Sequence, residues 1–176
     1  MTRDEFSGLV LSFLEDVAAF ARRLTRSASD ADDLLQETYE RAFERWEDLH
    51  EARACRAWLF RIARNRELDR RRATRARPEL RLVEPTDSIA PEPIVPAEVV
   101  ERLAAEELEV ALSSLSAEQR EVILLCDLWG FEYAEIAEIT RSPVGTVRSR
   151  ISRGRDRLVA RLAEIAREGK QERRTP

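Results

Sequence analysis

The sequence predicts an all-α protein in which two small helical domains are joined by an extended linker. Glycine is scarce, with five among 176 residues, and β-branched runs bounded by turn residues are almost absent. Apolar residues recur instead at the three- and four-residue spacing of amphipathic helices. Five of the seven prolines, at positions 78, 85, 91, 93 and 96, cluster in an acidic stretch where they disfavour helix. The predicted domains are therefore residues 1–77 and 98–176, with a linker at 78–97.

The composition, with 43% hydrophobic and 36% charged residues, is typical of a soluble protein with a core of its own. Cys55 and Cys126 lie far apart in apolar helical stretches, so we expect two reduced packing residues. His50 is the only histidine, and no nucleophile–base pair or glycine-rich phosphate loop is present. We therefore expect no catalytic residue, no cofactor and no metal. The N-terminus is not a signal peptide and no stretch is long enough to span a membrane, so we expect a cytoplasmic protein.

Three helices are expected in the first domain. The first runs from about Asp4 to Leu24 along an uninterrupted apolar stripe. The second follows the residues SASD, with Asp30 as its N-cap. Its inward-facing residues are Leu35, Tyr39, Ala42 and Trp46. The third covers about Arg56 to Arg72, and its buried start consists of Trp58, Leu59 and Ile62.

Charge is partitioned between the second and third predicted helices. Nine acids stand against two arginines between residues 30 and 51, and nine arginines stand against two acids between residues 56 and 77. Solvated helix faces usually mix the two signs. The partition predicts one helix that meets a basic partner and a second helix that meets an acidic partner.

The second domain has the pattern of a helix-turn-helix. A helix begins near Glu98, and SAEQ at 116–119 is a capping box for a further helix that ends at Gly130. The stretch EYAEIAEIT predicts a short helix. A longer basic helix follows, with Ser142 as its N-cap and Pro143 at its first position. A short helix, a tight turn and a longer basic helix form a helix-turn-helix.

The basic helix has two contrasting sides. Its apolar stripe consists of Val147, Ile151, Gly154, Leu158 and Leu162. Another side gathers hydroxyls and arginines, namely Thr146, Ser149, Arg150, Arg153 and Arg157, with Arg148 and Ser152 beside them. Short hydroxyls and long cations on one face suit a surface that meets phosphates and base edges.

Two segments resemble regions of one known family. LSAEQREVILLCDLWGFEYAEIAEITRSPVGTVRSRISRGRDRL resembles region 4 of the extracytoplasmic-function sigma factors, the small initiation subunits of bacterial RNA polymerase. DADDLLQETYERAFERW followed by AWLFRIARNRELDRRR resembles region 2 of the same family. The two matches cover roughly residues 4–75 and 100–162. A basic helix-turn-helix alone is shared with response regulators, whereas the pair joined by an acidic, proline-rich linker is a specific signal.

The resemblance to region 4 implies that the basic helix enters the major groove of the −35 promoter element. The positions that would face base edges are Arg148, Ser149, Ser152 and Arg153. The residues expected at phosphates are Ser142, Thr146 and Arg150. Three further arginines are expected to be solvated or near phosphate, namely Arg155, Arg157 and Arg161.

The resemblance to region 2 implies binding and opening of the −10 element. Asn65 matches a family position near the pocket for an extruded base. The phosphate contacts expected beside it are Arg61, Arg64 and Arg66. For Trp58, core packing is favoured over a role as a melting wedge, because this residue begins the apolar stripe of its helix.

The acidic helix matches the family's docking surface for polymerase. The expected contact residues are Asp33, Gln36, Glu37 and Glu40. The implied partners are core RNA polymerase, through its β′ coiled coil and β flap, promoter DNA and a cognate anti-sigma factor, without a small-molecule substrate. A linker of twenty residues spans about 66–72 Å when extended, comparable to the roughly 70 Å between duplex sites two helical turns apart.

Two other functions stay open on the residues alone. One is a helix-turn-helix regulator that binds an operator without polymerase. The acidic helix argues against this function, because an operator-binding protein does not need it. The other is a helical adaptor that binds only proteins, and the face of hydroxyls and arginines speaks against that.

Overall fold

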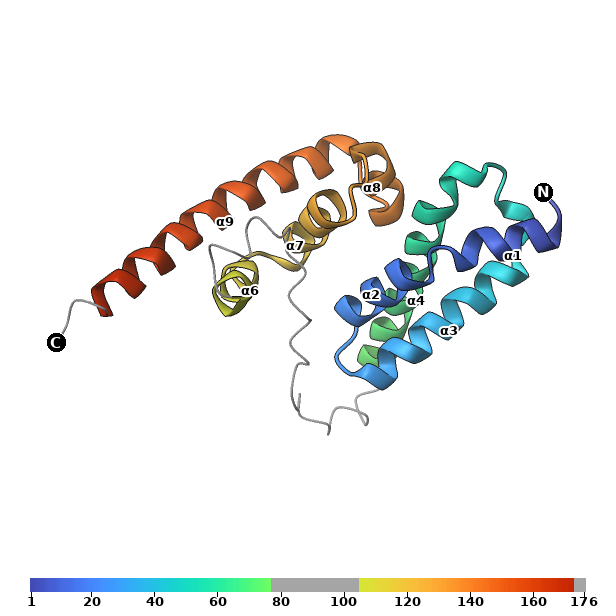
Figure 1. The fold of residues 1–176 in the computed structure, drawn as a ribbon, viewed down its shortest axis with the longest axis horizontal. Helices are drawn as coiled ribbons and strands as arrows, with labels where there is room; N and C mark the ends of the chain where they lie inside the picture. The colour runs from blue at the N-terminus through green and yellow to red at the C-terminus, as the bar shows by residue number, and fades with distance from the viewer. Residues whose placement is uncertain (77–104, 173–176) are drawn as a thin grey trace. The chain divides into compact units, whose positions relative to one another are not determined.

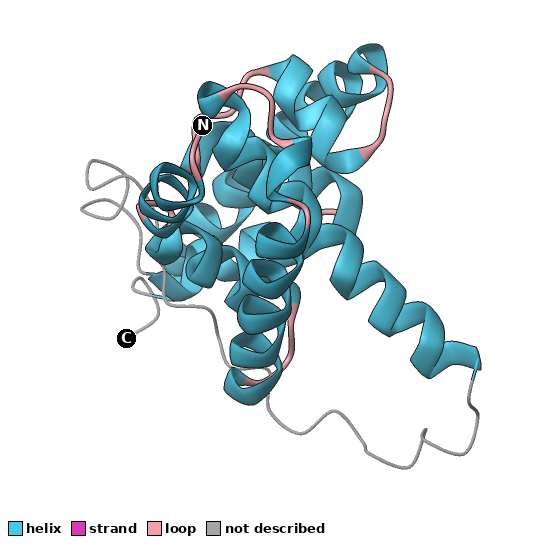
Figure 2. Ribbon diagram, turned by 90° about the vertical axis from the view of Figure 1, so that its right-hand side faces the viewer, coloured by secondary structure: helices cyan, strands magenta, loops and turns pink. Residues whose placement is uncertain are grey.

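The computed structural model describes residues 1–76 and 105–172, and within these ranges the chain is helical without a strand (Figure 2). The all-α prediction is thus confirmed. The chain divides into two compact units, which are described separately. The predicted linker at 78–97 lies outside the described residues, so the domain boundaries stay predictions. Within the described residues, no helix is both long and apolar enough to cross a membrane.

The first unit consists of α1 (Arg3–Leu11), α2 (Leu14–Leu24), α3 (Ala28–Glu44) and α4 (Cys55–Ala76) (Figure 1). Helices α2, α3 and α4 pack against one another. The core includes the fully buried Phe6, Leu34 and Leu59. The rings of Phe20 and Phe60 stack there with their centroids 4.5 Å apart. Each helix thereby buries one apolar side.

The predicted single helix from Asp4 to Leu24 is wrong, because the chain bends at Ser12 and Phe13 between α1 and α2. The Ser12 hydroxyl donates to the carbonyl oxygen of Leu9 at 2.7 Å. The Tyr39 hydroxyl, from α3, donates to the carbonyl oxygen of Val10 at 3.0 Å. These side chains satisfy carbonyls at the end of α1 and so stabilise the interruption.

The N-cap of α3 also differs from the prediction. It is Ser27 and not Asp30, because the Ser27 side chain accepts a hydrogen bond from the backbone N–H of Asp30 at 3.1 Å. Asp30 lies instead in the first turn, where a carboxylate is favourable at a helix N-terminus. Of the residues predicted to face inward, Tyr39 and Ala42 are buried, whereas Leu35 and Trp46 are half-buried.

Helix α4 begins one residue earlier and ends later than predicted. Trp58 and Leu59 are buried at its start, and Ile62 is half-buried. The Trp58 ring lies edge-on to that of Phe6 with the centroids 6.2 Å apart, which confirms core packing. Cys55 is free and buried, and burial raises the pKa of its thiol to about 11.

The second unit is built from α6 (Ala105–Ser113), α7 (Ala117–Ile123), α8 (Tyr133–Thr140) and α9 (Val144–Glu172) (Figure 1). The capping box of α7 is confirmed. The Ser116 hydroxyl accepts from the backbone N–H of Gln119, and the Gln119 side chain accepts from the backbone N–H of Ser116, both at 3.2 Å. The helix expected from Glu98 is described only from Ala105 onward.

The helix predicted after SAEQ runs through Val122, Leu125 and Cys126 and stops at Gly130 as expected, but it is not α-helical throughout. Residues Leu124–Leu128 form a π-helical turn, η4, and the backbone N–H of Trp129 donates to the Leu124 carbonyl at 3.2 Å. A π turn holds one more residue than an α turn and so shifts the side chains that follow it. Gly130 then adopts a φ of 67°, which is unstrained for glycine.

Helix α9 begins at Val144, one residue later than predicted, and the carbonyl of the preceding Pro143 accepts from the N–H of Val147 at 3.1 Å. The predicted apolar stripe lies inward. Val147, Ile151 and Gly154 are buried, and Leu158 and Leu162 are half-buried. A Cβ added at Gly154 would lie 2.5 Å from Cδ1 of Ile123, so glycine allows α9 to approach α7 closely.

Candidate functional site

The exposed side of α9 carries the side chains that were predicted to read bases. Arg148, Ser152 and Arg153 are exposed, and the described part of the chain offers none of the three a side-chain partner. Ser149 is half-buried, and its hydroxyl donates to the Thr146 carbonyl at 2.9 Å. The structure therefore leaves both guanidinium groups and one hydroxyl free for an external ligand.

The residues predicted to hold phosphates lie in the turn between α8 and α9 and in the first two turns of α9. Arg141 adopts the left-handed conformation with a φ of 51°, and the N–H of Ser142 donates to the Ala137 carbonyl at 3.0 Å. Arg150 donates from Nη1 to the Ser142 hydroxyl at 3.2 Å. Because this bond joins the turn to the following helix, Ser142 and Arg150 lie close together at the start of α9. Thr146 is half-buried one turn into the helix.

The arginines in the second half of α9 are not equivalent. Arg155 forms an ion pair with Asp127 of η4, donating through Nη2 and, at 3.3 Å, through Nε. The hydrogen bond to Asp127 raises the pKa of Arg155 above its ordinary value. Arg161 pairs with Glu164 on its own helix at 3.0 Å. Arg157 is exposed, as predicted. Arg155 therefore ties α9 to η4, a role that the sequence analysis did not assign.

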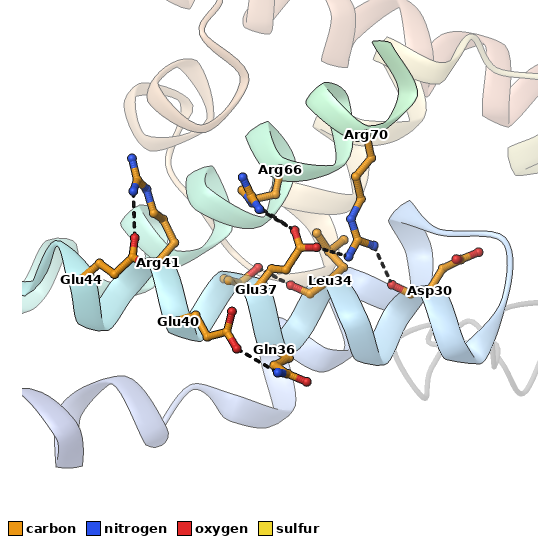
Figure 3. Close-up of polar contacts among 10 residues, drawn as sticks. Asp30, Leu34, Gln36, Glu37, Glu40, Arg41, Glu44, Arg66 and Arg70 are labelled. Carbon is orange, nitrogen blue, oxygen red and sulfur yellow. Dashed lines mark hydrogen bonds and ion pairs between the residues drawn. The ribbon is translucent and has the colours of Figure 1, made fainter. Parts of the chain in front are cut away.

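The acidic side of α3 carries the residues that were predicted to dock on polymerase. Asp33, Gln36 and Glu40 are exposed, and the Gln36 amide donates to Glu40 at 2.8 Å (Figure 3). Glu37 differs from them because it turns toward α4. Its carboxylate pairs with Arg66 at 2.8 Å and with Arg70 at 2.6 Å. Three of the four predicted residues thus share an open face, and the fourth joins two helices.

The residues predicted to bind the −10 element lie along α4. Arg61, Arg64 and Asn65 are half-buried, and Arg66 is exposed beside Glu37. The loop before α4 contains two 3-10 turns, η1 (Trp46–Asp48) and η2 (Ala52–Ala54). Leu49 is buried between these turns and anchors the loop to the unit.

The opposite charges of α3 and α4 are partly neutralised within the unit. Besides its pair with Glu37, Arg70 donates to the Asp30 carbonyl at 3.2 Å. Sequence reasoning missed Arg70, although Arg66 and Arg70 stand four residues apart and so share a side of one helix. The hydrogen bond from Arg70, and then the charges of Arg70 and Arg66, hold the pKa of Glu37 below its ordinary value. The separation of acidic residues on α3 from basic residues on α4 is therefore used in part for ion pairs between these two helices.

These features define a class: a helical unit with an acidic face, followed by a helix-turn-helix with a basic recognition helix. Two family models match the chain in this order, Sigma-70 region 2 over residues 9–77 and Sigma-70 region 4 over residues 105–158. The chain is 39% identical over 166 residues to the ECF RNA polymerase sigma factor SigE of Mycolicibacterium smegmatis, covering 93% of this chain and 63% of that relative. It is 42% identical over 134 residues to SigL of Mycobacterium tuberculosis, covering 75% and 74%.

Solved structures agree with the sequence relatives. The chain resembles the sigma factor RpoE in its complex with the anti-sigma factor NepR from Bartonella quintana, with a TM-score of 0.72, 34% identity, and coverage of 90% of this chain and 97% of that chain. It also resembles CnrH in complex with the cytosolic domain of CnrY, with a TM-score of 0.63 and 28% identity. The chain belongs to the ECF RNA polymerase sigma factors.

Proposed function

We propose that this protein directs promoter-specific initiation by bacterial RNA polymerase, with the second unit binding the −35 element and the first unit docking on the core enzyme and opening the −10 element. The observation that carries the proposal is that one chain matches both Sigma-70 regions and exposes Arg148 and Arg153 on α9, neither with a side-chain partner among the described residues. A recognition helix enters the major groove by its N-terminal residues, and this face lies at the N-terminal end of α9.

At the −35 element, Arg148 and Arg153 are the base-reading arginines. A free guanidinium group can donate bidentately to O6 and N7 of guanine. Ser149 and Ser152 supply short hydroxyls beside them. Phosphates are held by Ser142, Thr146 and Arg150, aided by the helix N-terminus. The bond between Arg150 and Ser142 supports this assignment, because it gathers two donors near the point where α9 begins.

At the −10 element, Asn65 contacts an extruded base, because a side-chain amide both donates to and accepts from a Watson–Crick edge. The phosphates of the opened strand are contacted by Arg61, Arg64 and Arg66. All four residues lie on α4, so a single helix can follow the strand.

The docking face for polymerase consists of Asp33, Gln36 and Glu40 on α3, and its partner is the basic side of the β′ coiled coil. The β flap is the proposed contact of the second unit. The chain contributes specificity while the polymerase performs the chemistry. Because polymerase and chromosomal DNA are the partners, we place the protein in the cytoplasm. By analogy with RpoE, whose structure was solved with an anti-sigma factor, we propose a cognate protein inhibitor.

Retention of core RNA polymerase tests the proposal against an operator-binding regulator. The full chain, immobilised on a resin, should retain purified core enzyme at physiological salt. An excess of another free sigma factor should displace the core enzyme. A chain that binds promoter fragments but retains no polymerase would be a helix-turn-helix regulator instead.

A further inference from the structure

Glu37 lies on the acidic helix α3, yet its carboxylate is committed to α4. Arg66 donates to Oε2 of Glu37 from Nη2 at 2.8 Å and from Nε at 3.1 Å, and Arg70 donates to Oε1 from Nη2 at 2.6 Å (Figure 3). Both carboxylate oxygens therefore accept from α4. Glu40, one turn further along α3, accepts instead from Gln36 of its own helix. The two glutamates share a helix and differ in what they hold.

The two arginines are held differently. The Arg70 side chain is 28% exposed and also donates to the Asp30 carbonyl at 3.2 Å. The Arg66 side chain is 44% exposed, and Glu37 is its one partner within the described ranges. An external anion can therefore bind Arg66 more easily than Arg70, which keeps its hydrogen bond to the Asp30 carbonyl.

The carboxylate of Glu37 and a DNA phosphate need the same donors. A guanidinium group presents a planar fork that binds carboxylate or phosphate bidentately, and Glu37 occupies the Nε–Nη2 edge of Arg66. A phosphate that takes this edge must displace Glu37. A phosphate on the remaining edge would lie near the negative charge of Glu37. In both cases Glu37 opposes phosphate binding.

We propose that Glu37 is a positioning residue that restrains DNA binding, because it holds Arg66 against α3 in competition with the phosphates of the opened −10 strand. This inference rests on the proposed function, which places Arg66 at that strand. The polymerase-docking face then consists of Asp33, Gln36 and Glu40, and Glu37 acts on the DNA-binding helix.

The test compares Glu37→Gln with the matched control Glu44→Gln, which removes the same charge from the same helix. Glu44 is exposed, pairs with Arg41 of its own helix and lies outside the docking face. Each full-length variant is assembled with saturating core polymerase. Binding is then measured, over a range of salt concentrations, to a promoter fragment that supports transcription by this chain and carries an unpaired −10 region. We expect Glu37→Gln to bind up to about fivefold more tightly than Glu44→Gln at low salt, a factor that corresponds to the strongest exposed ion pairs. Its salt slope should be steeper by up to about 0.7, the value for one added phosphate contact on a single strand.

The same substitution in a second variant chain tests whether the gain in DNA binding depends on Arg66. In a chain that already carries Arg66→Gln, the change Glu37→Gln should give no gain. Equal binding by Glu37→Gln and Glu44→Gln, weaker binding by Glu37→Gln, or a gain that survives Arg66→Gln would each overturn the inference. If Glu37→Gln does not stay folded, Glu37→Asp retracts the charge by one methylene and should give part of the gain. No gain from Glu37→Asp over Glu44→Gln would overturn the inference as well.

The same experiment separates this inference from the function on which it rests. If no fragment supports transcription by the wild-type chain with core polymerase, the proposed function fails and the inference fails with it. If the wild-type chain transcribes and the two glutamate variants bind alike, only the role of Glu37 is wrong.

Discussion

Arg153 and Arg157 stand one helical turn apart on α9, and both are exposed. Arg153 lies nearer the end of α9 that we propose enters the groove, so it should read a base. Arg153→Ala should cost about 1–3 kcal/mol of binding free energy on the correct −35 element and much less on a mutated one. Arg157→Ala should weaken all sequences alike and lower the salt slope by at most about one ion.

The measurement is binding of each variant to a panel of single-base −35 variants at two salt concentrations. Arg157→Ala serves as the control for loss of one positive charge on the same face. A uniform loss across the panel for Arg153→Ala would mean that this arginine grips phosphate and reads no base.

Asp33 and Gln36 test the docking face. Both are exposed on α3, and within the described residues the Gln36 side chain forms one hydrogen bond, to Glu40. Asp33→Ala combined with Gln36→Ala should therefore leave the fold intact and lower the affinity for core polymerase by about tenfold, or 1.4 kcal/mol. Competition with another sigma factor measures this affinity. Glu15→Ala, an exposed acid on α2, is the control, and equal affinities of the two variants would remove the docking claim.

Side-chain exposure could be predicted where it depends on the periodicity of a single helix. The periodicity of α9 was enough to separate Val147 and Ile151, which are buried, from Arg148 and Ser152, which are exposed. The partner of Glu37 could not be predicted in the same way. Its ion pairs depend on α3 and α4 lying side by side, which is a property of the tertiary structure.

At the scale of elements, α9 and α7 depend on Gly154 for their close contact. Gly154→Ala brings a Cβ against Ile123, which is itself buried, whereas a Cβ at Gly145 of the same helix meets nothing within 4 Å. Gly145→Ala should stabilise α9 by about 0.5–1 kcal/mol through helix propensity. In Gly154→Ala this gain is opposed by an overpacking cost of about 1–3 kcal/mol.

Urea denaturation of both variants, with hydrogen exchange of the α7 and α9 amides to locate the effect, measures the difference. Gly154→Ala should be the less stable of the two glycine variants. If Gly154→Ala is as stable as Gly145→Ala, the side chain of Ile123 moves freely and the close packing is not needed.

Helices were predictable as elements, and their interruptions were not. The bend after α1 rests on a hydroxyl from Tyr39, which is 29 residues away in sequence, so local patterning carried no sign of it. The π turn η4 lies within an apolar stretch that fits an α-helix equally well. The capping box at Ser116 was predictable because both of its hydrogen bonds connect residues three apart. A local motif with two reciprocal hydrogen bonds can thus be read from sequence, whereas the single local bond of the Ser27 N-cap and the long-range bond of Tyr39 were missed.

At the scale of the whole molecule, residues 78–97 are the predicted linker between two units for which we propose separate targets. Deletion of this segment should weaken promoter-dependent initiation more than it weakens core binding. Each unit would keep its own surface, while one chain could no longer hold both promoter elements. Abortive initiation and core-binding assays on the same preparation give the comparison. If initiation and core binding fell equally, the segment would contribute to the contact with polymerase and not only to the connection between the units.

Run-off transcription tests the central claim most directly, namely that this chain gives core polymerase its promoter specificity. Purified core enzyme is incubated with genomic fragments, with and without the full chain. We expect discrete transcripts only when the chain is present, from start sites that share a −35 and a −10 element. We also expect the chain with Arg153→Ala to lose these transcripts while still binding core polymerase. Transcripts that do not change when the chain is added, over the whole set of fragments, would show that the chain does not direct initiation.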